Sequence, residues 1–160
     1  MTFRIRGLDS APFRHLYGLS DAGLAVHGAR RVMVDSWPGY PERIEMRDLA
    51  PGETAILVNY THQPADTPYR SSHAVFVREG ATDAYEAVGE VPEVIRRRTI
   101  SLRAFDAAGN IVEADLVEGV AIEPMIDRFL ANAQVAYLHA HYAKYGCYAA
   151  LIERFSPRAP

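Results

Sequence analysis

Two histidines one residue apart, His139 and His141, are the strongest chemical signal in the sequence. They fall in a segment, residues 134–143, that we predict to be a strand paired through a short turn with a second strand at residues 147–155. Residues two apart in a strand point to the same face, so the two imidazoles lie close enough to share one ligand or metal ion. The plainer alternative is two hydrogen-bonded strand histidines.

The only cysteine, Cys147, follows the turn of this hairpin. A three-residue turn at residues 144–146, with Gly146 in the left-handed conformation, would pair Ala143 with Cys147. That register places the thiol on the same face as His139 and His141, whereas a two-residue turn would place it opposite. We favour three residues because the other face is then uniformly apolar. It would comprise Leu138, Ala140, Tyr142, Tyr148, Ala150 and Ile152.

A second polar segment, residues 61–71, follows a strand expected at residues 54–60 and contains two prolines. We predict that this loop folds over the histidine face, so that His62 and Arg70 border one pocket with the two strand histidines. The alternative is an ordered connection in which Arg70 pairs with Asp66 and Tyr69 covers the core.

The segments at residues 51–54 and 59–70, together with those at 139–141 and 145–147, resemble an uncharacterised bacterial family, domain of unknown function 1203 (DUF1203). The resemblance covers essentially the whole chain and implies a single domain. It implies no activity, cofactor or catalytic residue.

The residues support three hypotheses of function. In the first, the protein binds, or also acts on, a small anionic molecule: Arg70 would hold the anionic group through two hydrogen bonds, and His62 or His139 would act as acid or base. The ligand-binding residues would be His62, Tyr69, Arg70, His139, His141 and Cys147.

The second hypothesis is a transition-metal site, in which His139 and His141 are joined by His62, His73 or Cys147 as third ligand. The third is a non-catalytic interaction or dimerisation domain, such as a homodimer. One cysteine and dispersed histidines do not make the four-ligand set of a structural zinc, so we assign no metal ligand. Common nucleotide-binding, esterase and metalloprotease motifs are absent from the sequence, which leaves open the cofactor and whether the protein is an enzyme.

Length, composition and net charge indicate the number of domains, the compartment and which partners are excluded. The chain has 160 residues, 49% hydrophobic and 23% charged, which predicts one domain over residues 1–155 and a flexible tail at 156–160. Its net charge of −3 gives no positive field for nucleic acid. The single cysteine and the lack of an apolar leader or a long apolar run predict a cytoplasmic protein without a membrane partner.

The hydrophobic patterns predict an α+β fold, a mostly antiparallel sheet built from hairpins with about three short helices. The strand at residues 54–60 is apolar on both faces, so we expect it to be central and covered on both sides. The expected helices are residues 21–27, residues 93–98 and a segment that starts at Pro124, and the other strands are residues 3–8, 31–35, 43–46, 73–78, 99–106 and 111–120.

Overall fold

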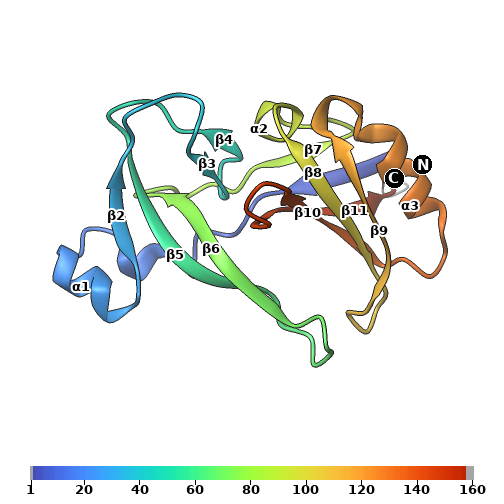
Figure 1. Cartoon of the computed structure of the whole chain (residues 1–160), viewed down its shortest axis with the longest axis horizontal. Helices are drawn as coiled ribbons and strands as arrows, with labels where there is room; N and C mark the ends of the chain where they lie inside the picture. Colours follow the sequence, from blue (N-terminus) through green and yellow to red (C-terminus); the bar gives the residue numbers. More distant parts are fainter. Residues whose placement is uncertain (1, 158–160) are drawn as a thin grey trace.

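Two β-sheets lie side by side in the computed structural model, which describes residues 2–157 (Figure 1). The six-stranded sheet has the order β7-β1-β11-β10-β8-β9, and the five-stranded sheet has the order β2-β5-β6-β3-β4. The first sheet contains β1 (Thr2–Arg6), β7 (Glu86–Val88), β8 (Thr99–Phe105), β9 (Ile111–Glu118), β10 (Tyr137–Tyr142) and β11 (Tyr148–Phe155). The second contains β2 (Arg30–Met33), β3 (Pro41–Glu42), β4 (Arg47–Asp48), β5 (Thr54–Gln63) and β6 (Ser71–Arg78).

The helices are short and lie outside the sheets. Within residues 2–157 they are α1 (Asp21–Val26), α2 (Glu93–Arg96) and α3 (Glu123–Ala131), with 3-10 turns η1 (Arg14–Leu16) and η2 (Gly119–Ala121). In the same part of the chain every paired strand is antiparallel to its neighbour except β3 against β6. The predicted α+β fold class is therefore confirmed. None of these helices is long and apolar enough to cross a membrane.

Local periodicity explains α3 well. Its apolar residues recur at helical spacing, and Ile126, Phe129 and Leu130 are buried against the six-stranded sheet. Arg154 of β11 closes the helix end, because its Nε donates to the carbonyl oxygen of Leu130 at 2.8 Å. The helix is thereby fixed against the strand that pairs with β10.

The segment at residues 43–46, expected to be a strand, is a tight turn between β3 and β4. The cause is the buried carboxylate of Glu42, which accepts hydrogen bonds from the backbone N–H groups of Ile44, Glu45 and Met46. Backbone donors that would serve a sheet ladder are used by one side chain instead.

Two other predictions need correction or lie beyond the structure. Residues 54–60 form part of β5, which is central between β2 and β6 as expected. Ala55 and Ile56 are fully buried in two different clusters, but Leu57 and Val58 are only half-buried, so cover on both sides is limited to the start of the strand. The predicted tail begins with Ser156 and Pro157, which are exposed and outside any strand. Its last residues, 158–160, lie outside the described part of the chain.

Candidate functional site

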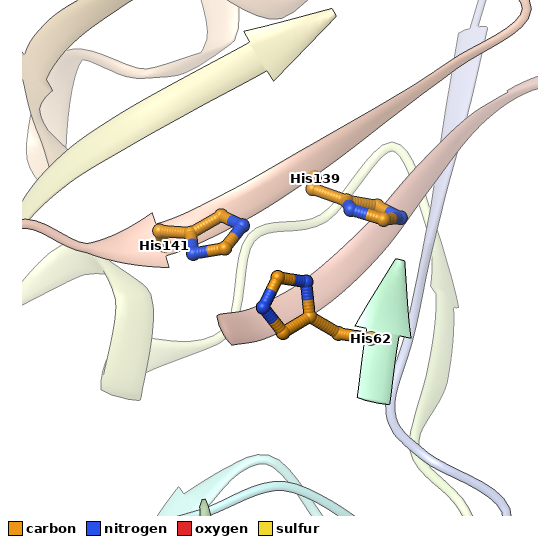
Figure 2. Close-up of side chains that lie close together, drawn as sticks. All are labelled: His62, His139 and His141. Carbon is orange, nitrogen blue, oxygen red and sulfur yellow. The ribbon is translucent and has the colours of Figure 1, made fainter. Parts of the chain in front are cut away.

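Three histidines from the two sheets gather at one point (Figure 2). His62 comes from β5, and His139 and His141 come from one face of β10. One ring nitrogen of each can be chosen so that the three lie within 4.8 Å of one another. The ring of His62 is centred 6.1 Å from that of His139 and 4.9 Å from that of His141, which lie 6.2 Å apart.

A β-bulge brings His62 to the strand histidines. In the ladder with β6, Thr61 pairs with Ser72 and Gln63 pairs with Ser71, so His62 is the extra, unpaired residue. A bulge bends its strand and redirects the side chain. The amide of Gln63 then donates to the hydroxyl of Tyr137 at 2.8 Å, which ties the end of β5 to β10.

A second bulge, in β11, decides what surrounds the pair on β10. Ala140 pairs with Ala150, but His141 pairs with Tyr148, so Ala149 is the extra residue. Since one inserted residue reverses the alternation of faces, Tyr148 joins the histidines instead of the apolar face that we predicted for it. The ring of Tyr148 stacks on His62 at 5.4 Å and 9°.

The same bulge makes the predicted placement of Cys147 wrong. The backbone N–H of Tyr142 donates to the carbonyl oxygen of Cys147, so four residues form the turn and the thiol lies on the face opposite the histidines. Gly146 is left-handed as expected, with φ of 77°. The thiol accepts a hydrogen bond from Arg43 at 3.0 Å and is not part of the histidine cluster.

Each histidine of the cluster keeps one buried ring nitrogen without a protein hydrogen-bond partner within residues 2–157. These atoms are Nδ1 of His62, Nδ1 of His139 and Nε2 of His141. The other nitrogen of His141, Nδ1, lies 2.9 Å from the carbonyl oxygen of Gly146 and donates to it. That bond selects the neutral tautomer in which Nε2 carries a free lone pair, the form of a metal-binding histidine.

Burial keeps the three imidazoles neutral. It lowers the pKa of His62 to about 4, with smaller contributions from Arg103 and His73. It lowers the pKa of His139 to about 3, and that of His141 to about 3 as well, although the bond to Gly146 opposes the second shift. Neutral imidazole is the state that binds a metal ion.

The cation Arg103 borders the cluster. It pairs directly across from His139 on β8, and its half-buried guanidinium contributes to the lowered pKa of all three histidines. Its Nε donates to the hydroxyl of Ser101 at 3.1 Å, and within residues 2–157 it pairs with no carboxylate. Sequence periodicity did not identify Arg103 or Tyr148, because both depend on which strands pair and in what register.

The structure does not bring Tyr69 and Arg70 into this cluster. Both side chains are exposed, and in the described chain Arg70 makes no ion pair, with Asp66 or with any other acid. The connecting loop packs elsewhere: the hydroxyl of Thr67 donates to the carbonyl oxygen of Gly109, in the β8–β9 turn, at 3.1 Å. The loop prediction is therefore wrong: of the segment at residues 61–71 only His62 and its neighbour Gln63 reach the strand histidines or Tyr137, and they do so from the end of β5.

Comparison with known proteins places most of the chain in one family model. Residues 39–154 match the family described as "Protein of unknown function (DUF1203)", and this segment includes all three histidines. No curated protein and no solved structure matches the chain.

Proposed function

The chain belongs to the DUF1203 family of proteins of unknown function, and we propose that this member binds one transition-metal ion through His62, His139 and His141. The observation that carries the proposal is the convergence of three neutral, buried imidazoles. Each has a nitrogen without a protein partner. This ligand set corresponds to the second of the three hypotheses drawn from the sequence, with His62 as the third ligand.

The energetic argument concerns these unpaired nitrogens. A buried polar group without a partner costs about 1–3 kcal/mol. Three such atoms in one cluster of histidines would be an expensive arrangement in a core with no ligand for them. One metal ion can bind a ring nitrogen of each histidine, because one nitrogen of each lies within 4.8 Å of the other two. The bond from His141 to Gly146 supplies the outer hydrogen bond that orients metal-binding histidines.

Three imidazoles favour Zn²⁺, Cu²⁺, Ni²⁺ or Fe²⁺ over Mg²⁺ or Ca²⁺, which prefer oxygen. Three protein ligands leave a coordination position for water or for a ligand, as in catalytic rather than structural zinc sites. Arg103 supports an anion at that position, because its guanidinium has no carboxylate partner in the described chain. A small oxyanion bound to the metal would agree with the first hypothesis, that the protein binds a small anionic molecule. Arg103 would then hold the anionic group, as was proposed for Arg70.

The test is a titration of chelator-treated protein with Co²⁺ and Zn²⁺. Cobalt in a tetrahedral site of nitrogen ligands gives visible absorption bands that aqueous cobalt lacks, so the spectrum reports the coordination directly. We expect one equivalent of Co²⁺ to bind, to be displaced by Zn²⁺, and to stabilise the fold by about 2.7 kcal/mol at a free concentration 100 times Kd.

Controls come from the other histidines of the chain. His62→Ala, His139→Ala and His141→Ala should each abolish the cobalt spectrum, whereas a His15→Ala/His27→Ala variant should keep it, since that pair is exposed. Loss of the spectrum in the exposed-pair variant, or its survival in all three single variants, would show that the metal binds elsewhere.

A further inference from the structure

A cavity of about 750 Å³ lies between the two sheets, on the face of the β10–β11 hairpin opposite the histidines. The turn of this hairpin, in red, lies between the sheets in Figure 1. The volume is that of a small-molecule site. The lining residues that matter here belong to two groups: the basic Arg43, Arg98 and Lys144, and the apolar Tyr40, Leu57 and Phe76.

The charge of this lining is one-sided. Two arginines, one lysine and His73 border the cavity, and no aspartate or glutamate of the described chain does. Arg98 forms an ion pair with the buried carboxylate of Asp48, in which Nη2 of the arginine lies 2.6 Å from Oδ1 of the aspartate. Lys144 is exposed at the edge and is the only lysine of the sequence. Low-dielectric walls concentrate such a field, so the cavity attracts anions.

Arg43 adds a buried charge without a counter-ion. It is 1% exposed, and within residues 2–157 it pairs with no carboxylate. Its guanidinium donates instead to the carbonyl oxygens of Tyr148 and Pro41 and to the sulfur of Cys147. A positive charge held only by neutral acceptors and a thiol leaves the inner end of the cavity positive.

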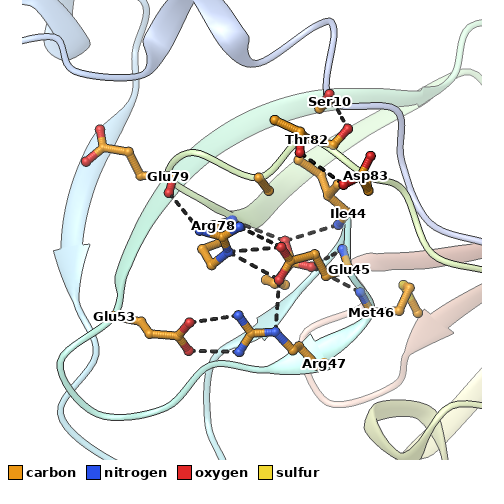
Figure 3. Close-up of polar contacts among 12 residues, drawn as sticks. Ser10, Ile44, Glu45, Met46, Arg47, Glu53, Arg78, Glu79, Thr82 and Asp83 are labelled. Atoms are coloured by element: carbon orange, nitrogen blue, oxygen red, sulfur yellow. Dashed lines mark hydrogen bonds and ion pairs between the residues drawn. The ribbon is translucent and has the colours of Figure 1, made fainter.

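The turn that carries Arg43 is held by hydrogen bonds to the carboxylate of Glu42 and is flanked by ion pairs. Figure 3 shows the ion pairs around it: Arg78 bonds Glu45 at 2.6 Å, and Arg47 bonds Glu53 at 2.7 Å. Neither arginine belongs to the cavity lining, and each is paired with a carboxylate. Arg43 therefore differs from Arg47 and Arg78, because it has no carboxylate partner in the described chain.

Tyr142 is a second observation that points to a polar ligand, because its buried hydroxyl lacks a hydrogen-bond partner in the described chain. It lines the cavity and is 4% exposed. The guanidinium carbons of Arg43 and Arg98 lie 5.0 Å and 5.2 Å from the centre of its ring. Two guanidinium groups thus lie close to the ring of a cavity-lining tyrosine whose hydroxyl is unpaired in the described chain.

The five-stranded sheet contributes the apolar wall. Leu57 of β5 and Phe76 of β6 border the cavity, and the ring of Phe76 lies 5.5 Å from that of Tyr40. We propose that the cavity binds a small organic anion with an apolar body, a medium-chain or aromatic monocarboxylate, whose carboxylate faces the basic wall and whose apolar part lies against Tyr40, Leu57 and Phe76. This site is separate from the histidine cluster.

Binding is tested by isothermal titration calorimetry with three small molecules that carry the charge, the apolar chain or both. Decanoate carries both the charge and the apolar chain, decanol only the chain, and acetate only the charge. We expect decanoate to bind with 1:1 stoichiometry and at least about tenfold more tightly than decanol, with no measurable binding of acetate. Equal binding of decanoate and decanol would refute the role of the basic wall.

Variants locate the site. Lys144→Gln should weaken decanoate binding about fivefold, whereas Arg70→Gln, which removes one exposed charge outside the lining, should not change it. Ala74→Phe, which places bulk in the cavity, should abolish binding, and Ala108→Phe, on the exposed β8–β9 turn, should have no effect. Thermal denaturation of each variant confirms that it is folded.

A second readout uses the only cysteine. Cys147 lines the cavity, so bound decanoate should slow its alkylation by iodoacetamide in proportion to occupancy. Binding that leaves the alkylation rate unchanged, or that survives Ala74→Phe, would place decanoate elsewhere and overturn the proposal.

Discussion

The buried histidines of β10 should make the metal-free protein sensitive to mild acid. Both His139 and His141 have a pKa of about 3 in the fold, against 6.5 for an ordinary histidine. The unfolded chain therefore binds more protons than the folded one below about pH 6.5. Their contribution to stability is complete above that pH and is lost progressively as the pH falls towards 3.

The size of the effect follows from the same values. At pH 5, protonation of one histidine in the unfolded chain favours unfolding by about 2 kcal/mol, and hardly any proton binds the folded form. The two histidines together amount to about 4 kcal/mol, a large part of the 5–15 kcal/mol by which a typical domain is stable. The shift arises from burial first, so it should persist without metal.

The assay is urea unfolding at pH 7, 6 and 5 in the presence of a chelator. The free energy of unfolding of the wild type should fall by about 4 kcal/mol more than that of a His139→Gln/His141→Gln variant. A His15→Gln/His27→Gln variant should follow the wild type, because those rings are exposed. The same pH slope in the wild type and the first variant would refute the reasoning.

Two further predictions concern single contacts. Asp48→Asn should lower the free energy of unfolding by about 3 kcal/mol, because the buried carboxylate holds two arginines and its loss leaves Arg98 without a carboxylate partner in the described chain; a loss under about 1 kcal/mol in urea unfolding would contradict this. Gln63→Ala removes the bond to Tyr137 that fixes the bulge, so it should weaken Co²⁺ binding about tenfold with little change in Tm. Unchanged affinity in Gln63→Ala would show that the bulge holds His62 without this bond.

Features set by neighbours in the sequence could be predicted from it. The stripe of Ile126, Phe129 and Leu130 on α3 follows from helical spacing, and the shared face of His139 and His141 follows from the period of two in a strand. Hairpins, turn glycines and the α+β class follow from the same local rules. His62 was a candidate because it stands in a polar segment after a strong strand.

Only the tertiary structure decided which of these residues form a site. An extra residue in each of two strands, His62 in β5 and Ala149 in β11, reverses the alternation of side chains. Local patterns cannot place such insertions, because a bulge is chosen by packing across strands that are distant in sequence. For that reason Cys147 left the histidine face, Tyr148 joined it, and the β8–β10 register set Arg103 beside it.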